Sequence, residues 1–175
     1  MAGARKVVIT GGPGAGKSTL LDELARRGER VEPEVARAIL QGQGGMALRA
    51  DDPHGFAHAM LDAELASWQR AHSSGGLTIF DRGFPDIAGF LAVEGLDIPE
   101  AIERICRDYR YDGPIFRAPP WRDIYRGDEE RIQTWQEAVE SDAAVSDAWR
   151  RFGYELIDLP LAPVEERVAF MLGLL

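Results

Sequence analysis

The sequence predicts a three-layer α/β fold in which helices cover both faces of a parallel sheet of about five strands. Two observations lead to this fold class. Short apolar segments alternate with longer segments whose apolar residues recur at helical spacing, which is the order of repeated βαβ units. The first apolar segment, residues 7–10, also leads straight into a glycine-rich turn and then a helical pattern. With 175 residues the chain is long enough to bury one core, so we expect one domain over residues 1–175.

Residues 11–19 form the glycine-rich turn, and their sequence is Gly-Gly-Pro-Gly-Ala-Gly-Lys-Ser-Thr. The positions of Gly11, Gly16, Lys17 and Ser18 match the phosphate-binding loop (P-loop) pattern G-x-x-x-x-G-K-[ST]. Glycines let successive N–H groups turn toward phosphate oxygens, and the following helix adds its positive end. Lys17 is expected to contact the β- and γ-phosphates, and Ser18 to bind the accompanying Mg²⁺. The turn therefore predicts a P-loop NTPase fold whose nucleotide-binding residues are Gly12, Gly14, Ala15, Gly16, Lys17, Ser18 and Thr19.

The elements after the P-loop place two carboxylates near it. Residues 17–27 are expected to form a helix, residues 28–32 a short and weak strand, and residues 34–41 a second helix. Glu32 and Glu34 fall at the boundary between that strand and that helix. Ligands of parallel sheets bind at the carboxyl ends of the strands, so we expect these carboxylates at the ligand-binding edge.

The third expected strand carries a second informative motif. A flexible break at residues 42–45 is followed by a long helix that opens at residues 51–53, and residues 77–80 then form a short apolar strand. This strand ends in Asp81 and Arg82. In a P-loop fold such an aspartate holds the magnesium shell or accepts the proton of an attacking hydroxyl, and the arginine steadies a phosphate. The alternative is a capping aspartate in a turn beside a surface arginine; the upstream P-loop favours the functional interpretation.

The second half of the chain continues the alternation of helices and strands. The expected elements are a helix from residue 84 to 95, a helix that opens at 99, a strand at 113–116, a helix at 129–152, a strand at 153–160 and a helix from 163. The single cysteine, Cys106, cannot form an internal disulfide and is expected to be a small buried residue.

Residues 117–131 combine four arginines with several acidic residues. In a kinase, a mobile lid of this kind closes over the phosphates, excludes water and supplies guanidinium groups to the transferred phosphoryl group. The alternative is a charged loop in which the arginines pair with their acidic neighbours. The location after a strand favours a lid.

The overall charge excludes some classes of partner. The formal net charge is −9, whereas proteins that bind nucleic acid polymers need a basic surface. No apolar run approaches the length of a membrane span, and the first residues leave no room for a signal peptide before the first strand. We therefore expect a cytoplasmic protein, monomeric or homodimeric, that acts on small molecules.

Several motifs spread over nearly the whole chain carry a family resemblance. They are Val-Ile-Thr-Gly-Gly-Pro-Gly-Ala-Gly-Lys-Ser-Thr at residues 8–19, Pro-Glu-x-Ala-Arg at 33–37, Phe-Asp-Arg-Gly-x-Pro-Asp at 80–86, Pro-Pro-Trp at 119–121, Gly-Tyr-Glu at 153–155 and Pro-Val-Glu-Glu-Arg-Val at 163–168. Together they resemble a family of small P-loop proteins of the AAA type that are labelled as ATPases. That family is similar to the ribosylnicotinamide kinase domain and, more distantly, to nucleoside and nucleoside-monophosphate kinases.

This resemblance implies a fold of the nucleoside-kinase type and transfer of the γ-phosphoryl group of ATP to a small acceptor. By position, it implies phosphate and Mg²⁺ binding by Lys17 and Ser18, the metal shell or the acceptor hydroxyl for Asp81, the phosphoryl group for Arg82, and the substrate for Glu34 and Arg37. The family's lid usually has an arginine close after Asp-Gly. Here the order is reversed and lengthened, which makes Arg126 and Arg131 equal candidates for the lid arginine.

The sequence therefore predicts a kinase that uses ATP and Mg²⁺. Positioning and charge neutralisation provide most of the catalysis, and Asp81 or Glu34 takes the proton of the acceptor, with Asp81 favoured by its place at a strand tip. The acceptor is left open among a nucleoside, a nucleoside monophosphate, a sugar derivative and an antibiotic hydroxyl. The alternative from another class is a switch protein that binds ATP, hydrolyses it slowly and acts through a protein partner; such a protein needs neither an arginine-rich lid nor an enclosed acceptor pocket.

Overall fold

A parallel sheet forms the centre of the computed structural model, which describes residues 3–126 and 133–175. The strands in this described part are β1 (Arg5–Thr10), β2 (Arg30–Glu32), β3 (Leu77–Asp81), β4 (Ile115–Arg117) and β5 (Leu156–Asp158). Their order across the sheet is β2-β3-β1-β4-β5, and every neighbouring pair is parallel. This arrangement confirms the predicted fold class. Because β1 is the central strand, the turn that follows it opens between the ends of β3 and β4.

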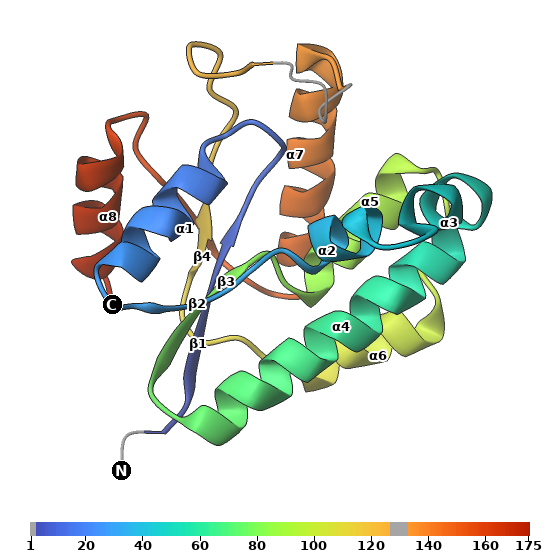
Figure 1. The fold of residues 1–175 in the computed structure, drawn as a ribbon, viewed down its shortest axis with the longest axis horizontal. Helices are drawn as coiled ribbons and strands as arrows, with labels where there is room; N and C mark the ends of the chain where they lie inside the picture. The colour runs from blue at the N-terminus through green and yellow to red at the C-terminus, as the bar shows by residue number, and fades with distance from the viewer. Residues whose placement is uncertain (1–2, 127–132) are drawn as a thin grey trace.

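Helices cover both faces of the sheet (Figure 1). They are α1 (Lys17–Arg26), α2 (Val35–Gln41), α3 (Gly45–Asp51), α4 (Pro53–Ser74), α5 (Phe84–Val93), α6 (Glu100–Asp108), α7 (Trp135–Arg151) and α8 (Val164–Leu172). None of the helices in residues 3–126 and 133–175 has the length and apolar character that a membrane crossing requires.

The alternation of side chains along β1 divides the core into two layers. Val7 and Ile9 are fully buried on the face covered by α1 and α8, and Val8 is fully buried on the opposite face, among residues of α4 to α7. A strand that buries both faces needs a continuous apolar run rather than an alternating pattern, and residues 7–9 provide one. The interior position of β1 thus follows directly from its sequence.

In the first half of the chain, the sequence predicted the start of one helix correctly and missed another helix. The start of α4 is as predicted, because Oδ1 of Asp52 accepts a hydrogen bond from the N–H of Gly55 at 2.9 Å and Pro53 occupies the first turn. By contrast, helix α3 was missed. The glycines at 42–45 indicated a break, but Gly44 has a left-handed φ of 76° that turns the chain directly into α3.

In the second half, α7 starts later than expected within the described residues. The helix was expected from residue 129, but residues 127–132 lie outside the described part and Thr134 caps the helix that begins at Trp135. The cap is reciprocal: Oγ1 of Thr134 accepts from the N–H of Glu137 at 3.2 Å, and Oε2 of Glu137 accepts from the N–H of Thr134 at 2.6 Å. The last strand, β5, covers only Leu156–Asp158 and is therefore shorter than the predicted range 153–160.

Candidate active site

The P-loop connects the end of β1 to the start of α1, and its glycines are required by both conformation and space. Gly11, Gly14 and Gly16 have φ values of 135°, 72° and 79°, which other residues rarely adopt. A Cβ atom on Gly11 would lie 2.3 Å from the carbonyl oxygen of Ala118, just beyond β4. The loop therefore packs directly against the neighbouring backbone and leaves no room for side chains at this position.

Lys17 is buried in the loop that it follows, with only 6% of its surface exposed. Its Nζ donates to the carbonyl oxygens of Gly11 at 3.0 Å and Gly12 at 2.6 Å. Burial and the nearby charge of Arg82 lower the pKa of Lys17 to about 8, against the opposing effect of Asp81. An anion bound in the loop would stabilise the protonated ammonium group, so the site is suited to a phosphate.

Two buried side chains from distant parts of the chain hold the loop in place. The guanidinium of Arg167, on α8, donates to the carbonyl oxygens of Ala15 at 3.2 Å and Gly16 at 3.4 Å. On the other side, Oδ1 of Asp142, on α7, accepts from the N–H of Gly12 at 3.3 Å. In this arrangement the N–H of Gly12, which we expected to face phosphate, is used to anchor the loop. No sequence pattern indicated a role for Arg167 or Asp142.

Arg117, the first arginine of the expected lid, is the last residue of β4 and is bound from two sides. Its Nη2 donates to Oδ2 of Asp142 at 2.6 Å, and its Nη1 donates to Oδ1 of Asp158 at 2.9 Å. Arg126 donates to the carbonyl oxygens of Asp123 and Tyr125, at 3.0 and 3.1 Å, within its own loop. Arg131 lies outside the described residues. The described structure therefore ties Arg117 to Asp142, which also anchors the P-loop, and places Arg126 on an exposed loop.

Asp81 occupies the end of β3, as the sequence predicted, and its side chain is almost completely buried, with 7% exposed. In the described part of the chain, its Oδ1 has no hydrogen-bond partner. Burial raises the pKa of Asp81 to about 6, with Lys17 opposing this shift and Glu34 adding to it. A buried carboxylate oxygen without a partner is costly, and a bound cation or a proton donor would satisfy it.

Arg82 is held in an unusual backbone conformation beside Asp81. Among the described residues it is the one non-glycine residue with a left-handed φ, 72°. Its Nε donates to Oε1 of Glu34 at 3.0 Å and its Nη1 to Oδ1 of Asp86 at 3.1 Å. Burial alone would lower the pKa of Arg82, but Glu34 and Asp86 raise it. The strained backbone thus fixes a permanently charged guanidinium between two carboxylates.

The carboxylate of Asp86 organises this part of the site. Its Oδ1 accepts from Oγ1 of Thr10 at 2.6 Å as well as from Arg82, and its Oδ2 accepts from the N–H of Gly83 at 3.0 Å and from Nε1 of Trp149 at 2.9 Å. These partners come from β1, the β3–α5 turn and α7. The sequence indicated Asp86 only as the start of a helix, because its contacts with Thr10 and Trp149 join residues more than 60 positions apart.

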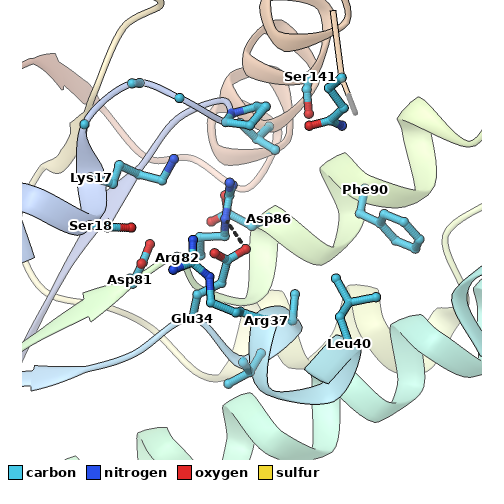
Figure 2. Close-up of a pocket in the computed structure, with 18 of the residues that line it drawn as sticks. Lys17, Ser18, Glu34, Arg37, Leu40, Asp81, Arg82, Asp86, Phe90 and Ser141 are labelled. Carbon is cyan, nitrogen blue, oxygen red and sulfur yellow. Dashed lines mark hydrogen bonds and ion pairs between the residues drawn. The ribbon is translucent and has the colours of Figure 1, made fainter. Parts of the chain in front are cut away.

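Glu34 and Arg37 come from the start of α2 and lie on the other side of Arg82. Burial disfavours ionisation of Glu34, but Arg82, Lys17 and Arg37 together keep its pKa below the usual value. Figure 2 shows Lys17, Ser18 and Asp81 at one end of the cavity, with Glu34, Arg82 and Asp86 in its middle. The structure thus brings the predicted residues of three separate motifs into one place.

A continuous cavity of about 910 Å³ joins these residues to two further compartments. Beside the P-loop it is bordered by Trp121, Ile124, Ala162, Pro163, Val164 and Arg167. Beyond Glu34 and Arg82 it enters an apolar compartment between α2, α3, α4 and α5, whose walls include Leu40, Met46, Phe56, Met60, Ile87 and Phe90. Cavities of this size and composition are typical of small-molecule sites.

Comparison with known proteins identifies the family of the chain. A family model described as an AAA domain matches residues 6–167. The chain belongs to this family. The resemblance read from the sequence motifs is thereby confirmed. A search of curated proteins finds no match for the chain.

Solved structures show that this AAA-domain chain has the fold of P-loop nucleoside and nucleotide kinases. Deoxyadenosine kinase from M. mycoides with bound dATP has a TM-score of 0.73 at 13% identity, over 96% of this chain and 97% of that one. Thymidylate kinase from Candida albicans has a TM-score of 0.70 at 10% identity, over 99% and 91%. NadR in complex with NR has a TM-score of 0.68 at 17% identity, over 98% of this chain but 50% of the NadR chain.

Substitution of Gly11 by alanine tests whether the P-loop depends on its close approach to Ala118. We expect Gly11→Ala to lower the free energy of unfolding by about 3 kcal/mol or more and to weaken nucleotide binding, because the new Cβ overlaps the Ala118 carbonyl. Gly28→Ala is the matched control: its φ is 93°, but a Cβ there meets nothing within 4 Å, so we expect a loss of only about 1–2 kcal/mol from backbone strain. Urea denaturation and titration with a fluorescent ATP analogue measure both effects. Equal losses for the two variants would contradict the role of the contact.

Substitution of Asp86 by asparagine tests its organising role. We expect Asp86→Asn to reduce the free energy of unfolding by about 3 kcal/mol, because a buried acceptor of four hydrogen bonds loses its charge and gains a donor. Asp147→Asn provides the control, since Asp147 pairs with Arg150 while its side chain is 79% exposed, and we expect a loss of about 0–1 kcal/mol. Urea denaturation gives both values, and a change of similar size in the two proteins would refute the organising role.

Proposed function

We propose that this protein is a phosphotransferase that uses ATP and Mg²⁺ to phosphorylate a hydroxyl or phosphate of a small, nucleoside-like acceptor. The observation that carries this proposal is the continuous cavity, which has the P-loop and Asp81 at one end, an apolar compartment at the other, and Glu34 and Arg82 between them (Figure 2). A phosphoryl transfer needs two reactants held side by side with charged groups at the junction. A nucleotide switch needs only the compartment for the nucleotide. The cavity therefore favours a kinase.

On the donor side, the triphosphate of ATP would lie along the P-loop, with Lys17 at its β- and γ-phosphates. Ser18 fits the requirements of Mg²⁺ because its hydroxyl is an oxygen ligand, and Oδ1 of Asp81, which is buried without a partner among the described residues, would accept a hydrogen bond from a water of the ion's shell. Mg²⁺ usually takes only one or two protein ligands beside phosphates and water. When bound, the ion would neutralise charge on the phosphates of ATP.

On the acceptor side, Arg82, Glu34 and Asp81 have separate roles. Glu34 and Asp86 hold Arg82 by its Nε and Nη1, which leaves its Nη2 with no hydrogen bond to any described residue and able to bind a phosphoryl oxygen. The ion pair also makes Glu34 a weak base, because its pKa is lowered. Asp81 has the higher pKa, about 6, and remains ionised at neutral pH. We therefore assign acceptance of the acceptor's proton to Asp81.

An acceptor screen tests the proposed activity. The purified protein is incubated with ATP, Mg²⁺ and a panel of nucleosides, nucleoside monophosphates, sugar derivatives and aminoglycosides, and phosphorylated products are detected by mass spectrometry. We expect one chemical class, nucleosides or their analogues, to gain a single phosphoryl group. Slow ATP hydrolysis without any phosphorylated acceptor would instead identify a nucleotide switch.

A pair of carboxylate variants tests the assignment of the base. We expect Asp81→Asn to reduce kcat by roughly 100-fold or more, because the proton acceptor is lost, and Glu34→Gln to have a smaller effect on kcat, because Asp86 still holds Arg82. Steady-state kinetics with the best acceptor measures both, and the Asp147→Asn variant serves as the unaffected control. Full turnover by Asp81→Asn together with loss of turnover by Glu34→Gln would transfer the role to Glu34.

A further inference from the structure

Glu64 is a buried acidic residue in the wall of the cavity, and none of the steps proposed above uses it. It lies on α4, only 3% of its surface is exposed, and it borders the same compartment as Phe56 and Met60, which lie on the same helix. A buried carboxyl that faces a cavity is costly unless its oxygens are satisfied by the protein or by a ligand. Its surroundings therefore indicate what kind of ligand group it would meet.

One oxygen of Glu64 is already used by the protein. Oε1 of Glu64 accepts a hydrogen bond from the hydroxyl of Tyr111 at 2.7 Å, and the N–H of Tyr111 donates to the hydroxyl of Tyr154 at 3.1 Å. The ring of Tyr111 is also packed against Phe80 and Trp149, with centroids 5.4 and 5.7 Å away. Tyr111 is thus fixed, and it fixes Oε1. The other oxygen, Oε2, has no hydrogen bond to any described residue and is the atom available to a ligand in the cavity.

Burial, with a smaller contribution from nearby carboxylates, favours the neutral form of Glu64. Burial raises the pKa of Glu64 to about 8; the hydrogen bond from Tyr111 opposes this shift, and the carboxylates of Asp86, Glu32 and Asp81 add to it. These groups belong to the segment before β4, to α5, to β2 and to β3. The basic groups that border the same cavity are Lys17, Arg37, Arg49, Arg82 and Arg167, and Nζ of Lys6 on β1 lies 4.4 Å from the ring centroid of Trp68 on α4. At neutral pH the carboxyl is therefore mostly protonated, and its proton resides on Oε2, since Oε1 already accepts from Tyr111.

We propose that Glu64 is a specificity-determining residue which, as a neutral acid, donates a hydrogen bond from Oε2 to a carbonyl oxygen or ring nitrogen of the acceptor. This inference rests on the proposed function, which places the acceptor in this compartment. The walls suit a planar ring, because Phe56 and Phe90 meet edge to face with centroids 5.3 Å apart and both border the cavity. A ring with a hydrogen-bond acceptor on its edge satisfies both the aromatic walls and Oε2. A ring edge that offers only N–H groups is disfavoured, because two donors would then face each other.

Two substitutions of Glu64 separate a neutral donor from an ionised acceptor. The amide of Glu64→Gln retains a donor at the position of Oε2, so we expect the KM for the acceptor at pH 7 to stay within about threefold of the wild-type value. Glu64→Leu removes the donor and should raise KM by roughly 10-fold or more. The control is Glu94→Gln, the same chemical change at an exposed residue outside the cavity, which should leave KM unchanged. A large rise in KM for Glu64→Gln at pH 7, equal to that of Glu64→Leu, would refute the neutral donor, and no change for Glu64→Leu would refute the contact.

The pH dependence gives a second signature. Above pH 8 the wild-type carboxyl loses its proton, so KM should rise by about tenfold per pH unit at most, whereas KM of Glu64→Gln should not show this rise.

The stability of the protein provides a test of the protonation state of Glu64 that needs no ligand. Because Glu64 is neutral when folded and ionises near pH 4.5 when unfolded, it makes the free energy of unfolding fall as pH rises from about 4.5 to about 8. Glu64→Gln should remove this component of the fall, and an unchanged dependence would contradict a neutral Glu64.

A binding experiment distinguishes failure of this inference from failure of the proposed function. Deoxyadenosine, deoxycytidine and thymidine are titrated calorimetrically into the wild type and the Glu64 variants in the presence of Mg²⁺ and a non-hydrolysable ATP analogue. Nucleoside binding that weakens only in Glu64→Leu, without phosphorylated product in the kinase assay, would support the donor role of Glu64 and refute the proposed kinase activity. Phosphorylation with the same kinetics in the wild type and all Glu64 variants would support the proposed kinase activity and refute the donor role of Glu64. Absence of nucleoside binding to the wild type would refute the inference.

Discussion

The buried carboxylate of Asp86 is the constraint on which the arrangement of the site depends. A charge in the interior is stable only if its oxygens are fully hydrogen-bonded, and four donors meet this requirement here. The four donors tie down three parts of the chain: Thr10 the end of β1 just before the P-loop, Arg82 and Gly83 the turn after β3, and Trp149 the helix α7. The left-handed backbone of Arg82, unfavourable by itself, is maintained by this set of bonds. One polar centre thus sets the distance between the P-loop and the proposed acceptor side.

The distribution of charge at the site contrasts with that of the whole chain. The chain carries a formal net charge of −9, yet Lys17, Arg82 and Arg167 all border one cavity. Of the carboxylates beside them, Glu34 and Asp86 are hydrogen-bonded to Arg82, and the third is that of Asp81. The pKa of Lys17 is lowered to about 8, largely by burial, so in the absence of phosphate the protein holds this charge at a cost. Such preorganised positive charge is what a phosphoryl transfer needs, since it requires no rearrangement when negative charge develops.

The sequence predicted the parts of the fold and the site that depend on local spacing, and it missed those that depend on packing. The P-loop and Asp81 were found because a glycine pattern and a strand tip can be read along the chain. Asp142 and Arg167 could not be found, because they reach the P-loop from residues more than 100 positions away. Helix α3 was missed because the glycines before it have the composition of a loop. Arg117 was grouped with the lid by proximity in sequence, whereas the end of β4 at this residue directs it toward Asp142 and Asp158.

The contacts that anchor the P-loop also connect the segment after β4 to the site. This segment leaves the sheet at Arg117, whose guanidinium binds Asp142 of α7, and the chain returns into α7 through the cap at Thr134. Near that return, the ring of Tyr125 meets the ring of Trp135 with centroids 5.5 Å apart. Asp142 in turn accepts the N–H of Gly12. Because α7 carries both Asp142 and Trp149, this one helix contacts the P-loop through Gly12 and the Asp86 centre through the indole N–H.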